Sequence, residues 1–404
     1  MNRRTFLAAS GSVLSVGVGA YGLYTRDARE DVPGSDGSGT TPAEDTREAT
    51  GSSPADSTAT SKPEAETRAG RTLSGMSPRS FSSSYTEAVE EWLGARQAIT
   101  VFFADMDRSD EGIEQRVSTL ETVWNRGAVP LMFWQPYFGA SDDDRQRVTQ
   151  AVADGEYDDR LHAWADAIAE WAVRPDGTDR RVYLNLAPEL NGSWVPWGIP
   201  TPETTPDSYI RMWRHIHDVV MATDLESDHV QWVWTVNHTS SGSVPLAECY
   251  PGDRYADWVS ITGYNWSNWG GWDTAEGIYG DALRTVREFS DVPAAFSEFG
   301  ASADCEDGHC PERKDEWIAS VYDFMADNDV RMACWFDHAV EKDGTDWGVF
   351  DAEFGPDRFQ HGGTEYRAYG TYRDVIGRDD VLTAHPNSPR RLTDEEFDGS
   401  FAEQ

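Results

Sequence analysis

The sequence predicts a (β/α)8 barrel, the TIM-barrel class of α/β fold, preceded by a disordered N-terminal tether. Eight short apolar runs are bounded by turn residues, as buried strands are. Segments with helical periodicity separate most of these runs. No Gly-x-Gly-x-x-Gly loop follows any of them, although an open nucleotide-binding sheet would require one. The expected strands are 72–76, 98–103, 129–134, 182–186, 230–236, 258–263, 294–299 and 332–336.

Apolar stripes place the helices between these runs. Ser84 and Glu87 fit a capping box that opens a helix with Trp92 and Leu93 on its buried face. Residues 239–256 are rich in Ser, Gly and Pro, so we expect a loop between the fifth and sixth strands. Further helices are expected near 113–124, 161–171, 210–220 and 317–324.

Composition divides the chain into four parts. Residues 1–26 resemble a twin-arginine export signal or anchor, 27–70 a disordered acidic Ser/Thr linker, 71–376 the barrel and 377–404 an acidic tail. The apolar run after the arginine pair contains Gly, Ser and Ala and is too short to define a membrane span. Cleavage and an uncleaved membrane tether therefore both stay open. In either case we expect an extracellular or cell-surface protein.

The charge balance narrows the range of partners. The chain has 71 acidic and 34 basic residues, a formal net charge of −37, and only three of the basic residues are lysines. Such a charge repels nucleic acid and anionic membrane, so we expect no nucleic-acid partner. At molar salt the Debye length falls to about 3 Å and self-repulsion is screened. We interpret the surface as adapted to brine; an ordinary acidic secreted protein is the alternative.

Four cysteines bear on redox state and metal binding. Cys305 and Cys310 lie in one polar loop, where a local disulfide fits an oxidising exterior. Cys249 and Cys334 fit either a second pair or two buried thiols. The spacing of Cys305, His309 and Cys310 matches no familiar zinc pattern. We therefore expect no metal and no organic cofactor, and we expect a monomer.

Two glutamates stand where predicted strands open into loops. Glu189 follows the fourth strand and Glu298 ends the seventh. In a (β/α)8 barrel the carboxyl ends of the strands carry the active site, so these two carboxylates should face each other across the barrel mouth. Hydrolysis of a glycosidic bond uses such a pair, with one carboxyl protonated and the other ionised. A separation of about 5–5.5 Å would give retention of configuration, and about 6.5–9.5 Å would give inversion.

The motifs around these glutamates resemble those of glycoside hydrolase family 26, with the acidic composition of a haloarchaeal-type member. The resemblance spans about residues 71–369 and rests on the order and spacing of several segments. These are Glu-Leu-Asn-Gly-Ser-Trp-Val-Pro-Trp-Gly at 189–198, Tyr-Asn-Trp at 264–266, Ser-Glu-Phe-Gly at 297–300, Ala-Cys-Trp-Phe-Asp at 333–337, and the segments 124–134 and 155–158.

The resemblance implies a retaining barrel glycosidase of the kind that includes β-mannanases, mixed-linkage β-glucanases and some xylanases. It implies that Glu189 is the acid/base, that Glu298 is the nucleophile and that the Tyr264 hydroxyl donates to Glu298. It makes Trp335 the floor under the sugar at the cleaved bond. Further candidates for contact with a polysaccharide are Trp134, Tyr137, Asn185, Asn191, Trp194, Trp197, Trp266 and Asp337.

Two positions depart from the family pattern Arg-x-x-His-Glu. Asn185 replaces the arginine and Pro188 replaces the histidine, which removes a cation and a hydrogen-bonding partner near the site. We expect a secreted endo-β-1,4-glycanase with β-mannan as first substrate. The alternatives are a mixed-linkage β-glucanase or xylanase of the same fold, a non-catalytic carbohydrate-binding barrel, and a glycosidase that trims the producing organism's own surface glycans.

Overall fold

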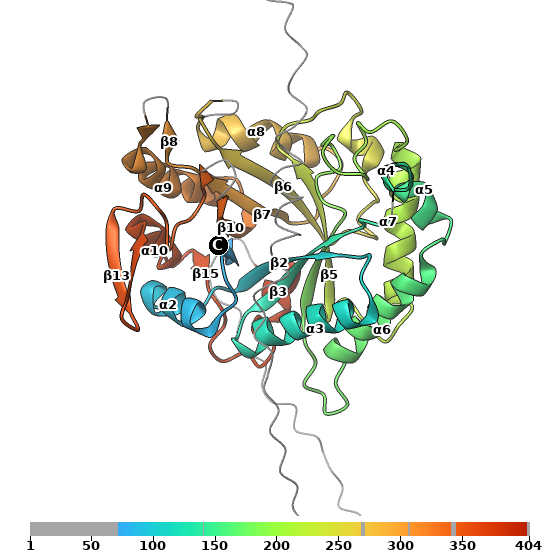
Figure 1. The fold of residues 1–404 in the computed structure, drawn as a ribbon, viewed down its shortest axis with the longest axis horizontal. Coiled ribbons are helices and arrows are strands. Elements are labelled where there is room, and N and C mark those ends of the chain that lie inside the picture. Colours follow the sequence, from blue (N-terminus) through green and yellow to red (C-terminus); the bar gives the residue numbers. More distant parts are fainter. Residues whose placement is uncertain (1–71, 140, 268–270, 306–307, 341–344, 402–404) are drawn as a thin grey trace, which may run out of the picture.

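Eight parallel strands close into a barrel surrounded by helices (Figure 1). The computed structural model describes residues 72–401 except 140, 268–270, 306–307 and 341–344. Strand β10 pairs with β1 and closes the ring, so the predicted barrel is confirmed. The barrel strands are β1 (Thr72–Pro78), β2 (Ile99–Asp105), β3 (Val129–Gln135), β4 (Val182–Leu186), β5 (Val230–Asn237), β6 (Trp258–Asn265), β7 (Ala294–Ala301) and β10 (Val330–Asp337). Each overlaps the strand that the sequence predicted.

The longer helices each bury one apolar face. In α7 the buried residues follow helical spacing, with Tyr209, Trp213, Ile216 and Val220 among them. The helices are α2 (Ser83–Leu93), α3 (Asp110–Asn125), α4 (Asp142–Gln146), α5 (Val148–Ala153), α6 (Asp158–Ala172), α7 (Pro206–Met221), α8 (Ala275–Val286), α9 (Pro311–Asp327), α10 (Gly370–Ile376) and α11 (Asp394–Asp398). None of the helices in the described ranges combines the length and apolar composition needed to cross a bilayer.

One predicted helix start was wrong. Helix α2 begins at Ser83, and the side chain of Ser82 accepts the Tyr85 amide, so Ser84 lies inside the first turn. The loop expected between the fifth and sixth strands is confirmed, since its only described regular element is a short 3₁₀ turn, Leu246–Cys249. Three short two-stranded sheets lie outside the barrel sheet. Their strands are β8 (Asp304–Cys305), β9 (Gly308–His309), β11 (Ala339–Val340), β12 (Thr345–Asp346), β13 (Asp357–His361) and β14 (Thr364–Ala368).

The C-terminal segment differs from the expected acidic tail. Strand β15 (Val381–Leu382) pairs with the first two residues of β1, and Phe397 is 1% exposed. The Arg181 guanidinium donates to the carbonyls of Leu392 and Thr393 at 2.8 and 2.9 Å. The segment therefore packs against the amino-terminal end of the barrel, and the ordered unit extends well beyond residue 376. The sequence did not predict this packing, because the few large apolar side chains that make the contact are scattered among acidic residues. The predicted export segment and linker lie outside the described residues.

Candidate active site

Glu189 lies in a strained turn just beyond β4. Ala187 and Glu189 both have left-handed backbone angles, φ 43° and 58°, which non-glycine residues seldom adopt. The turn is held from three sides: the Ala187 amide donates to the Trp134 carbonyl, the Glu189 amide to the Thr235 carbonyl, and the Trp197 indole to the Pro188 carbonyl. Surrounding strands thus impose a backbone that aims the carboxylate of Glu189. Such imposed strain is common at functional sites.

Glu298 lies in a bulge of β7. Between its pairs with Phe296 and Phe299, β7 contains one residue more than β10, and the β6 pairing shows the same excess. Phe296 packs on Tyr279 of α8 and Phe299 on Tyr322 of α9, so both face the helices. The two residues between them, Ser297 and Glu298, therefore both face the barrel interior. A bulge of this kind re-aims a side chain that regular alternation would point outward.

Both carboxylates act on Tyr264 of β6, Glu298 through a hydrogen bond and Glu189 through its charge. The Tyr264 hydroxyl donates to Glu298 Oε1. Burial raises the pKa of Tyr264 well above its usual value, and the negative charges of Glu298 and Glu189 raise it further. Glu189 is 2% exposed and Glu298 is 4% exposed. Tyr264 is thus a neutral phenol that donates to Glu298 and lies within electrostatic range of Glu189.

Glu189 receives two neutral donors. Its Oε1 accepts from Asn237 Nδ2 at 2.7 Å, and its Oε2 accepts from the Trp194 indole at 2.8 Å. Trp194 is half-buried, so it has both a hydrogen bond to the carboxylate and an exposed face. Asn237 was not among the sequence candidates. Its position as the last residue of β5 was the only signal that could have found it.

Three predicted sugar contacts lie away from the barrel mouth. Trp335 is fully buried on the outer face of β10, against Trp317 of α9 and Tyr372 of α10. Trp134 is fully buried on the outer face of β3 against Trp164 of α6. Asp337 is fully buried as well, on the same side of β10 as Trp335. The role of Trp335 as the floor under the sugar is therefore wrong, because strand alternation points its ring to the helices.

The remaining predicted contacts divide into buried and half-exposed groups. Trp197 is fully buried, and Asn185 is fully buried inside the barrel, where its amide donates to Ser297 Oγ at 3.0 Å. Asn191, 5% exposed, binds the main chain of Asn237. These three support the site from behind and present little surface to a ligand. Tyr137, Trp194, Tyr264 and Trp266 are the half-exposed aromatic residues near the carboxylates.

The sequence reasoning missed an aromatic cluster across the barrel mouth. Phe336 faces inward from β10 and contacts both Tyr264 and Phe103, with ring centroids 5.8 and 6.5 Å apart. Trp347, in the segment after β12, lies 4.7 Å from the Tyr264 ring and 5.8 Å from Trp266. Trp347 therefore lies beside Tyr264, the hydrogen-bond donor of Glu298, where Trp335 was expected. The irregular segment around it gave no periodicity from which its direction could be predicted.

Outer-face residues hold the segment that carries Trp347. The Trp335 indole donates to the Trp347 carbonyl at 2.8 Å. Lys314 of α9 donates to the carbonyls of Asp346 and Gly348 at 3.2 and 2.6 Å. Asp337 accepts the amides of Val349 and Phe350 and the hydroxyl of Tyr85. Three consecutive carbonyls and two amides of the segment thus bind buried side chains, which fixes the place of Trp347.

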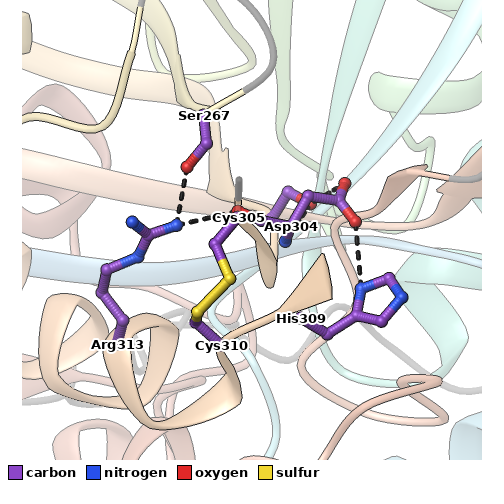
Figure 2. The surroundings of a disulfide bond; sticks show 7 residues. Ser267, Asp304, Cys305, His309, Cys310 and Arg313 are labelled. Carbon is purple, nitrogen blue, oxygen red and sulfur yellow. Dashed lines mark hydrogen bonds and ion pairs between the residues drawn. A yellow bond between two sulfur atoms is a disulfide. The ribbon is translucent and has the colours of Figure 1, made fainter. Parts of the chain in front are cut away.

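A disulfide loop after β7 braces two neighbouring loops (Figure 2). Cys305 and Cys310 are bonded, which confirms the predicted pair, while Cys249 and Cys334 are buried free thiols. Arg313 donates to the Asp304 carbonyl and to Ser267 Oγ in the loop after β6 (Figure 2). On the other side, His309 stacks on Phe354 with ring centroids 3.6 Å apart. The disulfide loop therefore links the segment of Trp266 to the segment of Trp347. Within the described ranges no group of three or more His, Cys, Asp or Glu side chains could hold a metal ion.

Comparison with known proteins agrees with this arrangement. The profile of the family described as glycosyl hydrolase family 26 matches residues 107–284. Endoglucanase H of Acetivibrio thermocellus is 27% identical over 267 residues, which are 64% of this chain and 25% of that protein. Mannan endo-1,4-beta-mannosidase of Bifidobacterium adolescentis is 24% identical over 217 residues, 50% of this chain and 21% of that protein. The chain thus spans about a quarter of the length of these curated relatives.

The fold comparison extends over most of the described chain. The catalytic domain of the family 26 endo-beta-1,4-mannanase of Bacillus sp. JAMB-750 superimposes with a TM-score of 0.56 and 18% identity, covering 81% of this chain and 87% of that domain. At this identity the superposition supports the barrel fold alone. Residues 107–284 thus resemble glycosyl hydrolase family 26 in sequence.

Proposed function

We propose that this chain is a retaining endo-β-glycanase that hydrolyses β-1,4-linked polysaccharide, with β-mannan as its first substrate. The observation that carries the proposal is a pair of buried carboxylates, one after β4 and one in β7, that both act on Tyr264: Glu298 accepts its hydroxyl and the charge of Glu189 raises its pKa. A glycosidase needs two carboxyl groups with different proton states on either side of the cleaved bond. The two carboxylates have different hydrogen-bond partners: a tyrosine hydroxyl donates to Glu298, and an amide and an indole donate to Glu189.

Glu298 is the nucleophile in this proposal. It accepts the Tyr264 hydroxyl, whose pKa burial and the nearby carboxylates raise, so Tyr264 stays a donor throughout the working pH range. A hydrogen bond to the ionised form favours that form, which keeps Glu298 ready to attack the anomeric carbon. As the covalent glycosyl–enzyme bond forms, Glu189 transfers its proton to the departing glycosidic oxygen. Glu189 then removes a proton from water, which attacks the anomeric carbon and releases Glu298.

The half-exposed aromatic residues support a carbohydrate substrate. Trp194, Tyr264 and Trp266 present ring surface near the carboxylates, and large flat rings suit the C–H faces of sugars. Trp347 is 7% exposed and packs against both Tyr264 and Trp266. We propose that Trp347 contacts the sugar bound next to Glu298, in place of Trp335.

Replacement of the two carboxylates tests the roles. Glu298→Ala should abolish hydrolysis of every substrate. Glu189→Gln should abolish hydrolysis of polysaccharide but spare the first step with activated aryl glycosides, whose leaving groups need little protonation. Glu396→Gln is a matched control, because this glutamate is fully buried in the cap of α11, far along the sequence from either carboxylate. Polysaccharide hydrolysis that survives Glu298→Ala would refute the assignment of the nucleophile.

A substrate panel decides the polymer. The relatives include an endoglucanase and a mannan endo-1,4-beta-mannosidase, so mixed-linkage β-glucan is the second candidate. Mannan, glucomannan, mixed-linkage glucan and xylan should be compared, with products identified by mass and the first-released anomer by NMR. A first product of inverted configuration would refute the double displacement. Binding of oligosaccharide without hydrolysis of any polymer would instead support a non-catalytic barrel.

We also propose that the protein acts outside the cell, in brine. The Cys305–Cys310 disulfide fits an oxidising environment, and the net charge of −37 fits high salt. Fractionation of the producing organism, with detection in medium, envelope and cytoplasm, tests the location. Recovery of the protein only from the cytoplasm would contradict it.

A further inference from the structure

Asn237 contacts Glu189 from the neighbouring strand end through a side chain that other hydrogen bonds restrain. We propose that Asn237 is a positioning residue for Glu189, which fixes the direction of this carboxylate and sets the pH above which it stops donating a proton. This inference deepens the proposed function and rests on the role of Glu189 as the acid/base.

The orientation of the Asn237 amide follows from its other contacts. Its Oδ1 accepts the backbone amide of Thr239 at 3.0 Å and the Thr239 hydroxyl at 2.9 Å. Because a backbone amide can only donate, Oδ1 must face Thr239 and the NH₂ group must face Glu189. The contact of 2.7 Å with Glu189 Oε1 is therefore a donation to the carboxylate.

The main chain of Asn237 is restrained as well. Asn191 Oδ1 accepts the Asn237 amide at 2.8 Å, and Asn191 Nδ2 donates to the Asn237 carbonyl at 2.8 Å. Asn191 lies two residues after Glu189, so the same turn that carries the carboxylate also holds its donor. Asn237 is 8% exposed. The carboxylate and its donor thus form one rigid unit built from the ends of β4 and β5.

This unit has a defined effect on proton transfer. An amide NH₂ donates but cannot accept, so it binds the ionised carboxylate oxygen more strongly than the protonated one. Asn237 therefore favours release of the Glu189 proton to the leaving oxygen. Titratable groups in electrostatic range of Glu189 include Tyr264 of β6, which also donates to Glu298 of β7, and Tyr137 after β3. Burial, Asp105 and Glu189 raise the pKa of Tyr137. Both phenols stay neutral, so Asn237 is a neutral donor beside a site with two acidic groups.

The test is the pH profile of Asn237→Leu and Asn237→Asp. Loss of a hydrogen bond to the ionised carboxylate should raise the pKa of Glu189 by about one to two units. The alkaline limb of the kcat/KM profile should therefore move to higher pH by that amount in Asn237→Leu. Asn237→Asp preserves shape and the contacts with Thr239 but places a second carboxylate against Glu189. It should move the limb at least as far, because the pair would share one proton.

A control and a second readout separate this role from loss of structure. Asn265→Asp makes the same change at the end of the adjacent strand β6, where the amide binds only the main chain of Asp273, and should leave the limb in place. In protein labelled with ¹³C at glutamate carboxyl groups, the signal lost in Glu189→Gln reports the titration of Glu189 directly. Its midpoint should rise in both Asn237 variants.

The outcomes are distinct. Movement of the limb and of the ¹³C midpoint together in the Asn237 variants, with Asn265→Asp unchanged, supports the proposal. Lower activity with an unmoved midpoint overturns it and leaves Asn237 a packing residue. Were the native protein inactive on every polymer, the proposed function would fail while the ¹³C midpoints would still decide whether Asn237 controls Glu189.

Discussion

Replacement of the buried Lys314 by methionine should change the pH dependence of stability in a direction that can be worked out from the structure. Lys314 is the only lysine in the part of the chain that the structure describes, and its side chain is 0% exposed. Its Nζ lies 2.6 Å from the Gly348 carbonyl and 4.7 Å from the centroid of the Tyr369 ring. An ammonium group at such a place keeps hydrogen bonds but loses its hydration.

Burial lowers the pKa of Lys314 from 10.5 to about 8, although Asp346, Asp337 and Asp304 counteract part of the effect. This difference corresponds to a cost of about 3 kcal/mol for carrying the charge in the folded protein. Below pH 8 both folded and unfolded chains bind the proton, so the full cost is present. Between pH 8 and 10.5 the unfolded chain binds more protons than the folded one, so stability rises with pH.

The assay is denaturant unfolding of the native protein and of Lys314→Met at several pH values between 7 and 10.5, at fixed salt. The free energy of unfolding of the native protein minus that of the variant should increase over this range by about 3 kcal/mol. Lys314→Gln, which also lacks a titrating group, should give the same slope. A difference that stays constant or decreases with pH would show that the folded lysine keeps an ordinary pKa.

Three further predictions concern the rim and the surface. Trp347→Ala should raise KM about tenfold with a smaller effect on kcat, since a sugar-stacking contact of about 1–2 kcal/mol is lost; an unchanged KM would exclude Trp347 from the site. Replacement of both Cys305 and Cys310 by serine should cost about 2 kcal/mol of stability at most and raise KM, because the brace between the loops of Trp266 and Trp347 loosens. Equal KM values for this variant and the native protein would contradict the brace. The melting temperature should rise between dilute buffer and molar salt as the charge of −37 is screened, and a flat response would argue against adaptation to brine.

Apolar periodicity was sufficient to predict the barrel because its strands are buried on both faces. Each of the eight runs is bounded by turn residues, and closure of parallel strands then brings their carboxyl ends to one rim. From this topological fact we expected Glu189 and Glu298 at the same rim before any side-chain direction was known. The packed C-terminal segment was missed because short contacts by Phe397 and β15 leave no periodic pattern in an acidic stretch.

Side-chain direction was the part that the sequence could not supply. Glu298 faces inward only because β7 contains an extra residue. The alternation of apolar and polar residues in a sequence does not show where such a bulge lies. Trp335 faces outward because β10 pairs residue for residue with β1 from Met332 to Asp337, and Phe336 takes the inward place. The motifs therefore indicated strand ends, whereas the directions of the Trp335 and Phe336 side chains could be read only from the structure.

The outward residues nevertheless serve the site through the main chain. Trp335, Lys314 and Asp337 lie between the barrel and its helices, yet each binds the segment that carries Trp347. Trp347 lies in an irregular segment, so its ring can stay beside Tyr264 only if that segment is held in place. Buried side chains that donate to its consecutive carbonyls hold it more firmly than surface contacts would. Trp335, predicted as the floor of the sugar site, therefore holds the main chain of Trp347 in place. Trp347 is the residue that we propose contacts the sugar instead.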